Sequence, residues 1–211
     1  MSISLTKQQK VSLKKSDGTN IEKLEIALGW EMIHNSNKYN ERGLAGFIKV
    51  LFGLTASSNM DCDLSCVCAK NGKIDGKTLV YFGSPNYKKA IKHSGDDLIG
   101  GKGDRERIKI DTSKLGEDID RVYIFVNVYN CEKRHQNFGM VENAYVRVID
   151  DKTGDEFCRY ELVDDYSQQT GIIVGQLIKE KTGSWEFYAD GEGLNVKNIV
   201  EVLNILKVKE G

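Results

Sequence analysis

The stretch AYVRVIDDKTGDEFCRYEL, residues 144–162, indicates the fold most directly. In it, two runs of alternating apolar and polar side chains, 144–149 and 157–162, lie on either side of Thr153-Gly154. Such alternation is typical of strands with one buried face, and a glycine between two runs supplies the positive φ that hairpin turns require. The stretch therefore predicts an antiparallel pair of strands.

Similar strand-like runs recur along most of the chain, separated by turn residues such as Asn71-Gly72, Asp75-Gly76 and Thr182-Gly183. They lie at 3–5, 11–13, 24–28, 79–82, 107–110, 122–129, 172–178 and 185–189. The first two runs predict short half-buried strands joined by a turn over Lys7 to Lys10. Many short strands at regular spacing predict an all-β fold, a sandwich of two antiparallel sheets.

Only the C-terminal region has a clear helical period. Its apolar stripe is Val196, Ile199, Val200, Leu203 and Leu206. Asn195 stands where an N-cap residue would satisfy the amides of the first turn. We therefore expect a C-terminal helix that packs on the edge of a sheet.

The length of 211 residues predicts a single domain, 1–211, with an extended connection at about 33–60 that holds an apolar part, 44–54. A net charge of -1, from 30 basic and 31 acidic side chains, provides no global field for nucleic acid, so no nucleic-acid partner is expected. No run approaches the roughly 20 apolar residues of a membrane span. The polar, alternating N-terminus and five cysteines favour a reduced, cytoplasmic protein.

The first candidate site is the segment 61–68, DCDLSCVC. Strand alternation sends Cys62, Leu64, Cys66 and Cys68 to one face, and Asp61 and Asp63 together to the other. The two carboxylates repel one another unless a cation or proton intervenes, although a solvent-facing acidic strand end is the commoner explanation of such a pair. The cysteines lack the second pair that a zinc site needs, so they are expected to be small core residues.

The second candidate site is the segment 93–106, HSGDDLIGGKGDRE. It places four carboxylates, Asp96, Asp97, Asp104 and Glu106, among glycines within eleven residues. Carboxylate and carbonyl oxygens are the ligands of hard cations, and a flexible glycine loop suits calcium better than magnesium. A merely solvated acidic turn is an equal alternative. The same carboxylates disfavour direct phosphate binding, and no catalytic motif surrounds any of the three histidines, so an enzyme is not expected.

With these segments in place, the chain resembles the TerD-type family of bacterial tellurium-resistance and general stress proteins. The resemblance extends to about Gly193 and depends on short blocks that occur in the order of the family. These blocks are Val11-Ser12-Leu13, Gly29-Trp30, Asp61-x-Asp63-Leu64, His93-Ser94-Gly95-Asp96-Asp97, Gln136-Asn137-Phe138-Gly139, Ala144-Tyr145-Val146-Arg147-Val148, Arg159-Tyr160-Glu161-Leu162, Gly175-Gln176-Leu177 and Trp185-Glu186-Phe187.

The resemblance implies a sandwich that binds calcium ions through both acidic segments and acts in stress or tellurite resistance, without an established catalytic activity. The positions that match the family's acidic residues are Asp61, Asp63, Asp96, Asp104 and Glu106. Asp97 stands where the family has asparagine or aspartate, and Gly101 and Gly103 would supply carbonyl oxygens. Lys102 and Arg105 reduce the negative charge of the loop, which predicts weaker or fewer calcium sites.

Three functional hypotheses follow from the sequence. The leading one is a non-enzymatic calcium-binding stress protein whose ion stabilises a surface for a protein partner. The second is a small-molecule binder, in which a loop-bound metal bridges to the phosphate of a cyclic nucleotide. The third is thiol chemistry on tellurite or another oxidant, which needs exposed and reactive cysteines.

Overall fold

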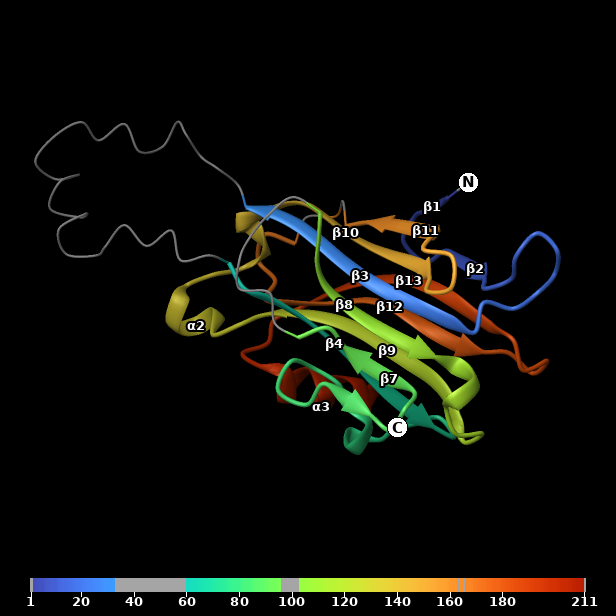
Figure 1. Ribbon diagram of the computed structural model, residues 1–211. Helices are drawn as coiled ribbons and strands as arrows, with labels where there is room; N and C mark the ends of the chain where they lie inside the picture. The colour runs from blue at the N-terminus through green and yellow to red at the C-terminus, as the bar shows by residue number, and fades with distance from the viewer. Residues whose placement is uncertain (1, 33–59, 96–102, 163, 165, 211) are drawn as a thin grey trace, which may run out of the picture.

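The computed structural model describes residues 2–32, 60–95, 103–162, 164 and 166–210 of the chain. These residues form two β-sheets that face one another, with one longer helix at the C-terminal end (Figure 1). The predicted all-β sandwich is confirmed. The connection at about 33–60 lies, but for its last residue, outside the described residues.

The first sheet has seven strands in the order β1-β11-β10-β3-β8-β7-β6. Its strands are β1 (Ile3–Leu5), β3 (Lys23–Met32), β6 (Asn86–Tyr87), β7 (Ile91–His93), β8 (Asp104–Asp111), β10 (Val141–Asp150) and β11 (Glu156–Glu161). Strands β10 and β11 are the hairpin predicted from residues 144–162, and they pair antiparallel. Strands β3 and β8 lie at the centre of the sheet and carry part of the candidate site.

The second sheet has six strands in the order β2-β13-β12-β9-β4-β5. Its strands are β2 (Lys10–Ser12), β4 (Cys62–Lys70), β5 (Lys73–Ile74), β9 (Ile119–Val128), β12 (Gly171–Lys179) and β13 (Trp185–Leu194). Strand β4 is the first strand after residues 33–59, which the structure does not describe. Beyond Leu64, its neighbours are β9 on one side and Val80 and β5 on the other.

The first two strands do not form the expected turn-linked pair. Strand β1 pairs parallel with β11 in the seven-stranded sheet, whereas β2 pairs antiparallel with β13 in the six-stranded sheet. The chain therefore crosses between the sheets over the polar residues 6–9. Alternation indicates that each segment is a strand, but it carries no information on which sheet the strand joins.

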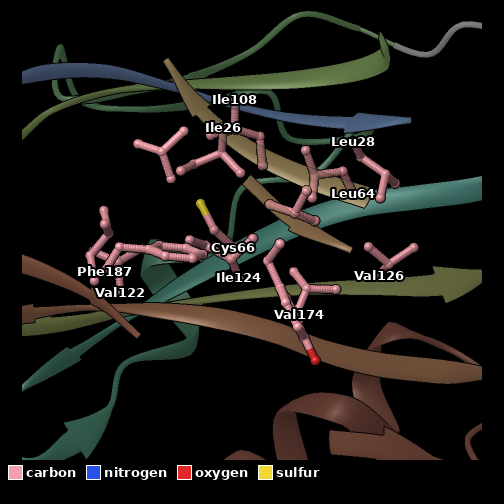
Figure 2. Packing of buried hydrophobic residues seen from close by; sticks show 14 of the residues in the cluster. Ile26, Leu28, Leu64, Cys66, Ile108, Val122, Ile124, Val126, Val174 and Phe187 are labelled. Atoms are coloured by element: carbon pink, nitrogen blue, oxygen red, sulfur yellow. The ribbon is translucent and has the colours of Figure 1, made fainter. Parts of the chain in front are cut away.

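The core fills the space between the sheets, and Figure 2 shows side chains from both layers pointing toward one another. Ile26 and Ile108 come from the seven-stranded sheet, while Leu64, Cys66 and Ile124 come from the six-stranded sheet. Each of these five side chains is fully buried. Close packing of this kind contributes most of the stability of a sandwich, and it fixes the two faces of β4.

The C-terminal helix α3 (Ile199–Lys209) packs on the outer face of the six-stranded sheet, so the expectation that it covers a sheet edge is wrong. Val202, Leu203 and Leu206 pack against Val67 and Phe125 there. The N-cap is Asn198 rather than Asn195, since the Asn198 side chain accepts from the amides of the first turn. Val200 is exposed, because the helix begins later than the apolar stripe indicated.

The short helical segments lie in connections between strands. They are α2 (Cys131–Arg134), η1 (Gly76–Thr78), η2 (Thr112–Lys114) and η3 (Phe138–Met140). The run at 79–82 was expected to be a strand, but it forms only isolated bridges, Val80 to Cys66 and Tyr81 to Ser84. Among the described helices, none has the length and apolar character to cross a bilayer.

Candidate functional site

The two acidic segments approach each other at Leu64, on the open edge of β4. The Leu64 amide donates to Glu106 Oε2 at 2.5 Å, and His93 Nε2 donates to the Leu64 carbonyl at 3.0 Å. The Gly95 amide donates to His93 Nδ1, which places the imidazole proton on Nε2. His93 Nε2 also lies 3.6 Å from Glu106 Oε2, and both side chains are buried. We call His93, Glu106 and the Leu64 backbone the Leu64 clasp.

The Leu64 clasp holds both ends of the glycine-rich segment next to Asp63. The chain leaves His93 through Gly95, at φ +100°, and returns to Asp104 and β8 through Gly103, at φ +106°. Both glycines have a backbone that other residues rarely adopt, which explains why the sequence needs glycine at these two points. His93 and Glu106, which are 29 and 42 residues from Leu64 in the chain, therefore contact the residue next to Asp63.

Asp61 and Asp63 lie on the opposite side of β4 from the cysteines, as the alternation predicted. Cys62, Leu64, Cys66 and Cys68 belong to the core between the sheets. Asp63 pairs across strands with Asn127, whose Nδ2 lies 3.5 Å from Asp63 Oδ2. An Arg134 nitrogen lies 3.7 Å from Asp61 Oδ2. Both distances are at the long end for contacts of their kind.

Asp104 lies on a different face of the molecule. Its carboxylate accepts from Arg147 Nε at 2.9 Å and from the Tyr145 hydroxyl at 3.0 Å, and Arg107 lies 2.9 Å away. The Asp104 side chain is only 1% exposed. Its negative charge is balanced by the guanidinium groups of Arg147 and Arg107 on the outer face of the seven-stranded sheet. Burial and the hydrogen bond to Asp104 raise the pKa of Tyr145.

A β-bulge separates Asp104 from Glu106. Leu28 pairs with Glu106 and the adjacent Gly29 pairs with Asp104, so Arg105 is an extra residue in β8. A bulge reverses the alternation, and it directs Asp104 outward while Glu106 points into the sandwich. The Arg105 guanidinium lies over the Trp30 ring, 4.6 Å from its centroid. No glycine or proline at position 105 signals this bulge in the sequence.

The structure describes five of the eight residues predicted as metal ligands and does not bring all five together. Asp61 and Asp63 share one surface, Asp104 binds arginines on the other sheet, Glu106 closes the Leu64 clasp, and Gly103 ends the loop. The remaining three, Asp96, Asp97 and Gly101, lie outside the described residues. In the part of the chain that the structure describes, no three His, Cys, Asp or Glu side chains are grouped to hold a metal ion. All eight remain sequence-based predictions.

The five cysteines are free and buried, which disfavours the thiol hypothesis. Burial raises the pKa of Cys62 and Cys66 well above the usual value, and it raises the pKa of Cys68 and Cys158 to about 12. Thiolates are the reactive form, so these four side chains are inert near neutral pH.

We expect a thiol-labelling reagent at pH 7 to modify the folded protein only as fast as the protein unfolds. All five cysteines should react at once in denaturant. Rapid labelling of any of Cys62, Cys66, Cys68 or Cys158 in the folded protein would restore the thiol hypothesis.

These features define a class of protein: a two-sheet sandwich in which both ends of a glycine-rich acidic segment are held against a strand that has paired aspartates at its start. The TerD domain family model matches residues 1–204. The chain belongs to the TerD family.

Relatives and solved structures agree with that assignment. The chain is 36% identical over 207 residues to stress response protein SCP2 of Bacillus subtilis strain 168, covering 97% of this chain and 98% of that protein. It is 29% identical to tellurium resistance protein TerD of Serratia marcescens, with 92% and 91% covered. A crystal structure of a TerD homologue from Streptomyces coelicolor A3(2) has a TM-score of 0.59 at 16% identity, covering 90% of this chain and 98% of that one, and supports the fold.

Proposed function

We propose that this chain is a non-enzymatic, cytoplasmic calcium-binding protein of the stress response, in which calcium orders the acidic loop and stabilises a surface for a protein partner. One observation carries the proposal. The Leu64 clasp brings both ends of the glycine-rich segment to the residue that follows Asp63, so these two ends and the paired aspartates are neighbours.

The described carboxylates differ in how well they suit calcium. Asp61 and Asp63 lie on one side of β4; the Asp61 side chain is 16% exposed and residue Asp63 is 5% exposed, in keeping with a site that is partly closed to water. Carboxylate oxygens of this kind are ligands that calcium prefers. Asp104 and Glu106 already accept from Arg147 and from the Leu64 amide, which favours Asp61 and Asp63 over them as ligands.

Asp61 and Asp63 would therefore hold the ion, together with loop oxygens for which the sequence predicts Asp96, Asp97 and Gly101. The ion would supply positive charge that offsets the repulsion between neighbouring carboxylates. Because calcium binds the folded form and not the unfolded chain, it would stabilise the protein by mass action. This is a structural or regulatory role and needs no reactive group.

The test is thermal unfolding in excess calcium and in chelator. We expect calcium to raise the melting temperature, by about 5–11 °C if the ion is present at about 100 times its Kd. Asp61→Asn combined with Asp63→Asn should abolish the increase, because both carboxylates are lost. Magnesium at the same concentration should give a smaller increase, since it keeps its water and demands a tighter octahedron.

Replacing Arg134 provides a matched control with the opposite expected effect on calcium affinity. Its guanidinium lies beside Asp61 and competes with a bound cation for the same carboxylate. Arg134→Gln should therefore lower the Kd for calcium, whereas Lys133→Gln on the same short helix should leave it unchanged. No melting response to calcium in the unaltered chain, with calorimetry also showing no binding, would contradict the proposal.

A further inference from the structure

The outer face of the six-stranded sheet has a small pocket of about 140 Å³ beside the first residues of α3. Three of its polar residues, Asp63, Ser65 and Asn127, come from the paired strands β4 and β9, and the others are Asn130, Lys197 and Asn198. Its aromatic residues are Tyr81, Phe82 and Tyr129. The volume is close to that of a cavity that holds benzene, about 150 Å³, so the pocket accepts one small group rather than a large ligand.

Two buried polar atoms from the lining residues lack partners. Ser65 Oγ and Asn127 Oδ1 make no hydrogen bond within the described residues, and their side chains are 0% and 5% exposed. A buried oxygen without a partner is costly, and such atoms in a native protein call for an explanation. Asn127 Oδ1 is an acceptor, and with the Asp63 carboxylate it makes the polar side of the pocket rich in acceptors.

The aromatic side of the pocket suits a cation. Phe82 packs edge to face on Tyr81 and on Tyr129, with ring centroids 5.5 Å and 6.1 Å apart. Phe82 and Tyr129 remain 37% exposed, which is unusual for large aromatic side chains with no partner molecule to cover. Tyr129 already takes one cation, because the Arg134 guanidinium lies 5.2 Å from its centroid.

The positive groups near the pocket are already engaged. Lys197 pairs with Glu132 at 2.9 Å, and the Lys197 amide donates to Glu201. Asn198 Oδ1 accepts from the amides of Val200 and Glu201, so these donors at the start of α3 are not offered to an anion. The unsatisfied groups of the pocket are oxygens, which call for a guest that donates hydrogen bonds.

We propose that this pocket binds the end of a protonated primary alkylamine. The ammonium group donates to Asn127 Oδ1, Ser65 Oγ and the Asp63 carboxylate, matching three N–H donors to three oxygens. The alkyl carbons next to the nitrogen lie among Tyr81, Phe82 and Tyr129. A calcium ion would not account for the aromatic side chains that line the pocket, because calcium takes six to eight oxygen ligands and aromatic rings supply none.

The test uses n-butylammonium, followed by saturation-transfer and chemical-shift NMR, in both chelator and calcium. In chelator we expect saturable binding with a Kd of about 1 mM, which is within reach of so small a ligand. In calcium we expect weaker binding, because the ion competes for the Asp63 carboxylate. Tetramethylammonium has the charge but no N–H donor, and it should bind about tenfold more weakly. Nα-acetyl-lysine amide carries the same ammonium group on a lysine side chain. If it also binds, the natural ligand can be a lysine of a peptide; if only n-butylammonium binds, the natural ligand is a free amine.

Variants separate the two sides of the pocket. Asn127→Leu and Ser65→Ala remove oxygens and should each weaken butylammonium binding about tenfold. Phe82→Leu should weaken it about threefold, whereas Tyr87→Leu on the other sheet should not change it. Ser65 Oγ and exposed Phe82 contribute little to folding, so these two variants keep the test valid if Asn127→Leu does not fold.

Three results would overturn the proposal: no saturable binding of n-butylammonium in chelator at concentrations well above 1 mM, equal affinity for tetramethylammonium in chelator, or an amine affinity that Ser65→Ala and Phe82→Leu both leave unchanged. Weaker amine binding in calcium is expected, because both cations use the Asp63 carboxylate. The calcium proposal is judged separately, because Phe82→Leu and Ser65→Ala should leave the calcium-dependent melting temperature unchanged. Failure of either proposal therefore does not decide the other.

Discussion

Replacing Glu106 by leucine is expected to lower the free energy of unfolding by about 2–3 kcal/mol, because the Leu64 amide is left buried without an acceptor. Glu106 Oε2 accepts that amide at 2.5 Å and lies 3.6 Å from His93 Nε2. The measurement is urea unfolding in chelator, so that calcium does not contribute.

Glu106→Gln is the matched variant. A glutamine retains an oxygen that can accept from the Leu64 amide, so it should cost clearly less than leucine. If leucine were tolerated as well as glutamine, the Leu64 clasp would have no role in stability. The glycine-rich loop would then lose the anchor that holds it beside Asp63.

Replacing Asp104 by alanine is expected to cost about 2 kcal/mol while leaving the calcium-induced rise in melting temperature unchanged. The buried Asp104 carboxylate accepts from Arg147 and Tyr145 and pairs with Arg107. Breaking a fully buried ion pair costs about 3–5 kcal/mol. Here the loss is smaller, because Arg147 and Arg107 are 28% and 43% exposed and water can solvate them. Each arginine also keeps another carboxylate partner, Glu156 for Arg147 and Glu25 for Arg107.

Asp151→Ala is the control, since Asp151 makes a single pair at 2.5 Å with the exposed Lys109 on the same sheet. It should cost less than about 1 kcal/mol, as surface pairs do. A loss of the calcium response in Asp104→Ala would return Asp104 to the ligand set that the sequence predicted.

Much of the fold follows from local patterns. Alternation and glycine turns predicted the β10 and β11 hairpin, the inward cysteines of β4 and the outward Asp61 and Asp63. These features depend on the two-residue period of a strand and on the burial of one face, and both are visible in a single segment. The sheet assignment of β1 and β2 was not predictable, because it depends on which distant strand each of them meets.

The candidate site was predicted only in part for the same reason. The sequence indicates the acidic residues, but no local signal marks Arg105 as the bulge residue that sends Asp104 and Glu106 to different faces. No sequence pattern assigns His93 a contact, and only the structure places its imidazole on Leu64. Asn127 and Ser65 carry no motif, and their importance comes from oxygens that the fold leaves without partners.

The most direct measurement is a crystal structure grown in calcium, with the ion identified by its anomalous scattering. The account predicts an ion with oxygens of both Asp61 and Asp63 at about 2.3–2.6 Å, and with Asp104 still held by Arg147 and Arg107. An ion coordinated by Asp104 and Glu106 instead, or protein crystals in calcium with no ion near Asp61 and Asp63, would contradict it.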